Sequence, residues 1–221
     1  MIKPCVPKPY IFSVEGCTEK WYLDWLREKI NSSDIPRYKV NIRAKVEKNP
    51  EKFVKSLYMI NDSKIKIWHV CDYEKNDTFH SNRFKNTIDL MKNAEKLDKK
   101  ITYGLSYTNL TFELWIILHK TCLNTHISDS NDYLKHINRH FNENFKSLEE
   151  YKEEKNFKRI LTKIDLNDVK LAICHAKTIM NQNKINGLHL KNHNGEEYYE
   201  ENPSLSIWNI IEEILKECEY N

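Results

Sequence analysis

Strand-like and helix-like patterns alternate four times through the first half of the chain. Four runs read as strands, because they are rich in β-branched or aromatic residues or because their apolar and polar residues alternate. Each run is followed by apolar residues at helical spacing. The strand-like runs are residues 9–14, 37–46, 64–72 and 99–108. The helical stretches begin near Thr18 as a cap, at Pro50, around Phe84 and between Asn109 and Thr111. Strands joined in this way run parallel, so the sequence predicts an α/β fold with a mostly parallel sheet flanked by helices.

The second half of the chain shows no further strand pattern after Leu123. Residues 131–141, 167–180 and 204–217 are predicted to form amphipathic helices, and the polar stretches 146–158 and 186–203 are predicted to be loops. We therefore expect residues 1–123 to form the α/β domain. Residues 124–221 should form a helical extension packed on it, either as a separate unit or as part of one continuous domain.

Composition excludes several classes of protein. The 221 residues include 35 Lys and Arg against 32 Asp and Glu, so a net charge of +3 does not indicate a strongly basic nucleic-acid binder. The six cysteines stand singly without a Cys-x-x-Cys pair, which argues against a zinc ribbon. With no apolar run of membrane length and no signal-peptide pattern, the expectation is a cytoplasmic protein with reduced thiols.

Acidic residues occur where the predicted strands end. Glu15 follows the first strand, Asp72 and Glu74 end the third, and Glu113 lies in the first turn of the helix after the fourth. Ligands of parallel α/β sheets bind at the carboxyl ends of the strands, so these carboxylates should approach one another. Clustered carboxylates repel unless a cation lies between them, and oxygen ligands favour Mg²⁺ or Mn²⁺. Such an ion can support phosphodiester hydrolysis.

Each of these acids also has an ordinary structural explanation. Glu19 and Glu113 are in first helical turns, where the helix dipole favours a negative charge. Asp72 after a strand is typical of a cap or turn residue. From the pattern alone, a metal site and a purely structural role remain comparable alternatives.

Four motifs in this order resemble the RloB-like (abortive-infection) proteins. They are "VEGCTE" before a helix, "HVCDYE" after a strand, "NLTFELWIILH", and the late "ENPSLSIWNIIEEIL". The resemblance runs from about Tyr10 to Leu215, and the block around Phe112–Trp115 is its most specific part. The family implies a Toprim-type core, in which a glutamate after the first strand and an Asp-x-Asp pair after a later strand serve Mg²⁺-dependent chemistry.

The resemblance assigns roles to five acids. Glu15 matches the first glutamate, Asp72 matches the first aspartate of the pair, and Glu74 stands where the second aspartate is usual. Glu74 has one more methylene than that aspartate, which leaves the metal geometry open. Glu19 matches a further candidate ligand of the related OLD-family opening, and Glu113 matches the glutamate of its own motif. The implied metal ligands are Glu15, Glu19, Asp72 and Glu74, and the implied catalytic residues are Glu15, Asp72, Glu74 and Glu113.

The resemblance implies a Mg²⁺- or Mn²⁺-dependent nuclease acting on DNA or RNA in anti-phage defence, with a possible partner ATPase. The alternative is a non-catalytic regulatory or scaffold subunit that docks on such an ATPase and binds a metal or nucleotide weakly. The chain is short for a topoisomerase, and it lacks a zinc module of the kind found in bacterial primases.

Other residues near these motifs carry weaker hypotheses. Lys20 and Lys75 could neutralise phosphate charge, whereas His119 is interpreted as a structural residue at a helix end. The basic runs 96–101 and 156–163 could contact nucleic acid but are interpreted mainly as solvated faces.

Overall fold

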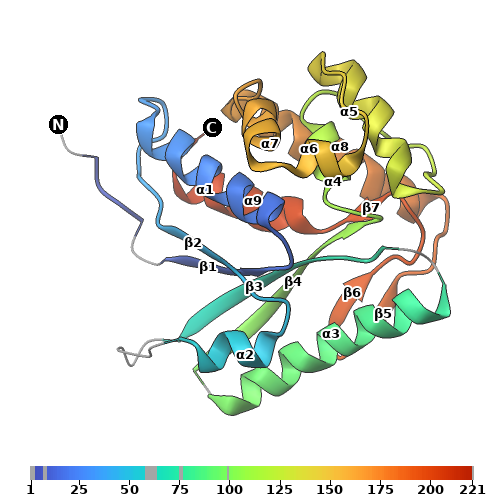
Figure 1. Ribbon diagram of the computed structural model, residues 1–221. Helices are drawn as coiled ribbons and strands as arrows, with labels where there is room; N and C mark the ends of the chain where they lie inside the picture. Colours follow the sequence, from blue (N-terminus) through green and yellow to red (C-terminus); the bar gives the residue numbers. More distant parts are fainter. Residues whose placement is uncertain (1–2, 7–8, 58–63, 75–76, 99, 221) are drawn as a thin grey trace.

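The computed structural model describes residues 3–6, 9–57, 64–74, 77–98 and 100–220. Its centre is a five-stranded sheet in the order β2-β1-β3-β4-β7, of which the first four strands are parallel and β7 is antiparallel to β4. The strands span Tyr10–Val14 (β1), Ile42–Val46 (β2), Ile65–Asp72 (β3), Ile101–Asn109 (β4) and Ser204–Leu205 (β7). The α/β fold with a mostly parallel sheet is confirmed, and Figure 1 shows the sheet between two groups of helices.

Helices alternate with the first four strands as expected. They span Cys17–Ser32 (α1), Pro50–Lys55 (α2), Thr78–Leu97 (α3) and Glu113–Leu118 (α4). In Figure 1, α2 and α3 lie on one face of the sheet and α1 and α4 lie on the other. Two hydrophobic clusters correspond to these faces, and Phe53 of α2 and Phe84 of α3 belong to the smaller one. No helix in the described ranges is long and apolar enough to cross a membrane.

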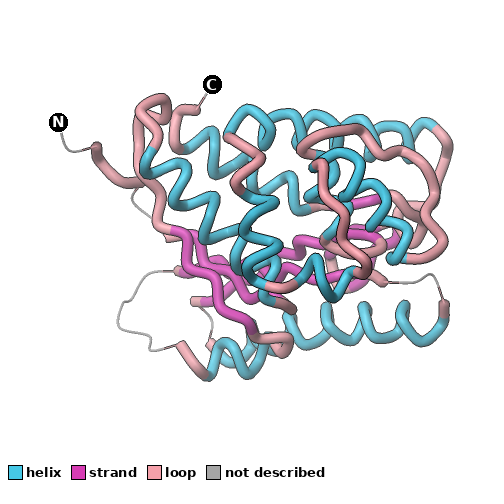
Figure 2. The backbone as a smooth tube through the Cα atoms, turned by 45° about the horizontal axis from the view of Figure 1, so that its top comes forward, coloured by secondary structure: helices cyan, strands magenta, loops and turns pink. Residues whose placement is uncertain are grey.

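Later helices extend the layer above α1 and α4. They span Tyr133–Phe141 (α5), Leu148–Lys152 (α6), Glu154–Leu161 (α7), Leu166–Ile185 (α8) and Ile207–Glu217 (α9), with a short 3-10 turn at Ser130–Asp132. Figure 2 shows this thick helical layer above the sheet, with α2 and the long helix α3 below it. One hydrophobic cluster runs through both halves of the chain, so the later helices share a core with the α/β part.

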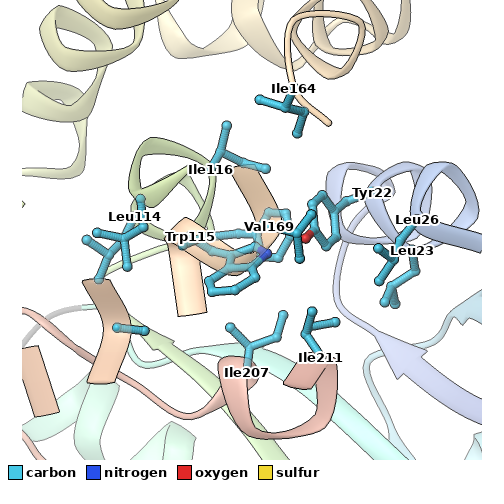
Figure 3. Packing of buried hydrophobic residues seen from close by; sticks show 14 of the residues in the cluster. Tyr22, Leu23, Leu26, Leu114, Trp115, Ile116, Ile164, Val169, Ile207 and Ile211 are labelled. Atoms are coloured by element: carbon cyan, nitrogen blue, oxygen red, sulfur yellow. The ribbon is translucent and has the colours of Figure 1, made fainter. Parts of the chain in front are cut away.

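Trp115 lies at the centre of this shared core. Its side chain is fully buried and packs edge-on against Tyr22 of α1, with ring centroids 6.1 Å apart. Figure 3 shows the indole between Tyr22, Val169 of α8, and Ile207 and Ile211 of α9. The large apolar residues of α4 therefore fasten the loop after β4 to helices from the far end of the sequence.

Two stretches predicted to be loops are ordered elements. Residues 146–158 contain α6 and most of α7, in which Tyr151 and Phe157 are fully buried. Residues 186–203 contain an antiparallel hairpin, Lys191–His193 (β5) and Glu196–Tyr198 (β6). The prediction of no strands after Leu123 is therefore wrong. Helix α6 and the two hairpin strands are too short to show a period in the sequence, and packing supplies the stability that local pattern does not.

Two predicted helix starts are also displaced. The last predicted helix begins at Ile207, because Ser204 and Leu205 pair with β4. The helix after β4 begins at Glu113, since β4 continues to Asn109. In both cases pairing within the sheet outweighs helix propensity, which is a weak prior.

Gly104 makes room for an aromatic side chain across the sheet. It is paired in register with Trp68 of β3, and a Cβ added to Gly104 would lie 2.6 Å from the indole ring. Lys66 covers the ring, with its Nζ 3.9 Å from the centroid. We expect Gly104→Ala to lower the free energy of unfolding by about 1–3 kcal/mol through overpacking. Denaturant unfolding beside Thr102→Ala, on the same strand opposite Lys66, tests this. Equal unfolding midpoints would contradict it.

Candidate active site

Three strands bring two of the predicted acids together at the carboxyl edge of the sheet. Glu15 follows β1 and Asp72 is the last residue of its neighbour β3. The backbone N–H of Asp72 donates to Oε2 of Glu15 at 3.4 Å. Thr108 lies opposite Asp72 on β4, and its hydroxyl donates to Asp72 Oδ1 at 2.7 Å. The parallel register therefore sets both carboxylates side by side, as the sequence predicts.

The start of α1 adds a third, buried carboxylate. Glu19 is only 4% exposed, and its Oε2 accepts a hydrogen bond from the hydroxyl of Thr18 at 3.0 Å. The helix N-cap is Gly16 and not Thr18, which corrects the predicted cap. A Cβ on Gly16 would lie 2.8 Å from the same Glu19 oxygen. The glycine therefore leaves space for this carboxylate to lie against the beginning of its own helix, where the dipole favours negative charge.

Glu74 is tied to α3. Its backbone has a φ of 66°, in the left-handed region. Both of its carboxylate oxygens accept from Nη1 of Arg83, at 3.0 and 2.9 Å, and Nε2 of His80 lies 3.3 Å from Oε2. His80 in turn contacts Asp77, which caps α3. Glu74 therefore holds Arg83 at the site, whereas the sequence suggested a metal ligand.

Glu113 lies deepest of the predicted acids. It begins α4 and is 1% exposed. The ammonium of Lys152, at the end of α6, lies 3.2 Å from its Oε1. That contact lacks hydrogen-bond geometry, and neither carboxylate oxygen of Glu113 has a hydrogen-bond partner among the described residues. A helix from the second half of the chain thus supplies the nearest positive charge to this buried acid.

Four of these acids, Glu15, Glu19, Asp72 and Glu74, line one cavity of about 240 Å³. Its lining combines acids at the sheet edge with three cations, one from the loop after β2, one from α3 and one from α6. The lining residues are Glu15, Gly16, Cys17, Thr18, Glu19, Lys48, Asp72, Glu74, Arg83 and Lys152. A cavity with both signs of charge is suited to an anionic ligand if a bound cation lies between that ligand and the carboxylates.

Burial and mutual repulsion disfavour the ionised acids. Burial raises the pKa of Asp72 well above its usual range, and the charges of Glu19 and Glu113 raise it further, against the hydrogen bond from Thr108. Burial also raises the pKa of Glu19, and Glu113 and Glu15 add to the shift. For Glu15, burial again raises the pKa, while the Asp72 amide, Arg83 and Lys48 oppose the increase. A bound cation would relieve this repulsion.

The donors fit a hard divalent cation by chemistry. Every acidic ligand candidate offers carboxylate oxygens, which Mg²⁺ and Mn²⁺ prefer, and the buried oxygens of Glu113 have no hydrogen-bond partner among the described residues. Within the described ranges, however, no three His, Cys, Asp or Glu side chains are grouped closely enough to hold a metal ion.

Sequence reasoning missed the three cations that line the cavity. Lys48 follows the carboxyl end of β2, so the rule that located the acids could have located it too. Arg83 and Lys152 lie inside helices, where nothing in the local sequence distinguishes them from other basic residues. Lys20 instead pairs with Asp24 of its own helix at 2.5 Å, and Lys75 lies outside the described residues.

His119 belongs to the core. It is fully buried, its Nδ1 hydrogen bonds to the carbonyl of Trp115 at 2.9 Å, and its Nε2 lies 3.1 Å from the hydroxyl of Tyr22. Burial lowers the pKa of His119 to about 4, so the neutral ring accepts from the tyrosine. The structural interpretation of this histidine agrees with these contacts.

Comparison with known protein families gives a match over most of the chain. The family model described as "RloB-like protein" matches residues 10–214, which is most of the chain. Searches of curated proteins and of solved structures gave no match. The matched range contains the cavity-lining residues described above.

Proposed function

We propose that this chain, which belongs to the RloB-like family, is a metal-dependent nuclease that hydrolyses phosphodiester bonds of nucleic acid. The observation that carries the proposal is the set of repelling carboxylates, Glu15, Glu19 and Asp72, at the carboxyl edge of a parallel sheet beside cationic side chains. The Toprim-type core and a role in anti-phage defence, with or without a partner ATPase, belong to this proposal through the resemblance.

Each group would have a distinct task. Glu15, Glu19 and Asp72 would hold Mg²⁺ or Mn²⁺, which when bound activates water and stabilises charge on the phosphate oxygens. Thr108 orients Asp72 through its hydrogen bond, and the Asp72 amide orients Glu15. Because the cavity is partly enclosed by protein, the charges there are screened less than on an open surface.

The cations at the cavity would position the substrate. Arg83 is held by Glu74, and Lys152 is held by its ion pair with buried Glu113. Both can offer remaining N–H groups to phosphate oxygens, for which the guanidinium has suitable geometry. We therefore assign positioning roles to Glu74 and Glu113. The other three acids would bind the divalent metal.

The direct test is turnover. Purified protein is incubated with labelled single-stranded DNA, double-stranded DNA and tRNA in Mg²⁺, in Mn²⁺ and in EDTA. The expected result is cleavage of at least one polymer in a divalent metal and none in EDTA. Intact substrates under all conditions would remove the support for a nuclease that acts alone.

A non-catalytic subunit is the second candidate. It is favoured by the net charge of only +3, since a subunit that does not cleave nucleic acid needs no strongly basic surface. Both candidates allow weak metal binding, so only turnover separates them.

Divalent metal should raise the melting temperature if the carboxylates bind it. A ligand at about 100 times its dissociation constant stabilises the fold by about 2.7 kcal/mol, or roughly 5–10 °C for a chain of this size. Differential scanning fluorimetry in Mg²⁺, Mn²⁺ and EDTA measures the shift, with NaCl at matched ionic strength as the control. A shift no larger than that in NaCl would contradict a specific site.

A further inference from the structure

Phe79 is the most exposed large hydrophobic side chain among the described residues. It is the second residue of α3 and is 71% exposed. The apolar residues that α3 contributes to the core are Phe84, Ile88, Met91 and Ala94, all of which are buried. Phe79 is therefore outside the core-facing stripe of its helix. A single exposed apolar residue needs no explanation by itself, so its surroundings must decide its role.

The surroundings of Phe79 are the cavity. Residues four apart on a helix are neighbours on one face, separated by about 6 Å along the axis, so Phe79 lies beside Arg83. Arg83 and its partner Glu74 both line the cavity. The ring of His80 lies edge-on to Phe79, with centroids 5.2 Å apart, and His80 also contacts Glu74. The exposed ring is thus one helical turn from the candidate active site.

The adjacent cations retain capacity for an anion. The ion pair with Glu74 uses only Nη1 of Arg83, so Nε and Nη2 have no hydrogen-bond partner in the described part of the chain. Lys48 is exposed and forms no ion pair with any described residue. Phosphate is the anion expected at these groups, because the guanidinium offers it a bidentate contact. An aromatic face next to phosphate-binding groups has the composition of a nucleotide-binding surface.

We propose that Phe79 stacks on an unpaired base of the substrate strand, next to the phosphate that Arg83 and Lys48 bind. This inference deepens the nuclease proposal and rests on it for the identity of the ligand. Inside a duplex, neighbouring bases cover both faces of each base, so an exposed phenyl ring can stack there only on a base that is single-stranded or flipped out. The substrate class is therefore nucleic acid with unpaired nucleotides, read without strong sequence preference.

The test uses binding, so it is independent of cleavage. Single-stranded oligonucleotides carrying one 2-aminopurine, whose fluorescence is quenched on stacking, are titrated with the full chain in EDTA at low salt. Matched oligonucleotides with an abasic site and a blunt duplex complete the set. The variants are Phe79→Ala, Phe79→Trp and the control Leu97→Ala, which removes an exposed side chain at the other end of α3.

We expect Phe79→Ala to weaken single-strand binding roughly 5- to 150-fold and to reduce the change in 2-aminopurine fluorescence. Phe79→Trp and Leu97→Ala should bind as the parent does, and Phe79→Ala should melt at the parent temperature because the side chain is exposed. Equal affinities of Phe79→Ala and the parent would overturn the inference and leave the nuclease proposal intact. Failure of the parent to bind any oligonucleotide would also overturn it. The nuclease proposal fails separately, through absence of metal-dependent cleavage.

Discussion

Asp72→Asn is expected to abolish metal-dependent cleavage while the fold remains. The side chain is central to the site, between Glu15, Thr108 and the buried Glu19. Loss of a metal-binding carboxylate removes several kcal/mol of transition-state stabilisation, or at least about 1,000-fold in rate. An Asn oxygen can still accept from Thr108, so the local backbone should not change. Steady-state cleavage in saturating metal measures the effect.

The matched control for this variant is Asp89→Asn. Asp89 lies on the surface of α3 and contacts His193 of the β5–β6 hairpin, outside the cavity. It should retain parental cleavage within about twofold, because surface substitutions away from a site have small effects. Full activity of Asp72→Asn, or equal losses in both variants, would contradict the assigned site.

The same variant should be more stable than the parent in EDTA. An Asp has an ordinary pKa of about 3.9, and the folded protein raises the pKa of Asp72 well above this. The fold therefore favours the protonated form, so the contribution of Asp72 to stability is complete below about pH 4 and is lost as pH rises through the raised pKa. Asp72→Asn avoids this loss of stability, because asparagine does not ionise.

Melting temperatures measured in EDTA across this pH range test the sign. The advantage of Asp72→Asn should grow as pH rises and should vanish near about pH 4, where both side chains are uncharged. A variant that is less stable than the parent at neutral pH in EDTA would show that the Asp72 carboxylate is stabilised by its surroundings.

Trp115→Ala is expected to give the largest loss of stability, about 3–5 kcal/mol. The indole is fully buried between α1, α8 and α9, so its removal leaves a cavity at the centre of the larger hydrophobic cluster. Because Glu113 lies two residues earlier on α4, the site should also lose order. Chemical denaturation measures the change in the free energy of unfolding.

Trp208→Ala provides the comparison within α9. Its side chain is only partly buried at the edge of the same cluster, where Lys177 lies over the ring. The loss of stability should be clearly smaller than for Trp115→Ala, because less apolar area returns to water. Similar losses in the two variants would argue against Trp115 as the centre of the shared core.

Local pattern in the sequence determined much of this protein. Alternating strand and helix signals predicted the parallel sheet, because chain direction follows from a helix between successive strands. The same order located Glu15 and Asp72 at one edge, since parallel strands end on the same side. Glu113 was placed correctly in the first turn of the following helix.

Tertiary structure decided what depends on contacts between distant segments. The cationic part of the cavity comes from Lys48, Arg83 and Lys152, and only folding brings these residues beside the acids. Glu74 forms an ion pair with Arg83 of α3. Ser204 and Leu205, predicted to be helical, form a strand because they pair with β4. Helix and strand periods record which face of an element is buried. These periods do not predict which element or charged residue the buried face will contact. Ion pairs and strand pairing depend on distances that exist only in the folded chain.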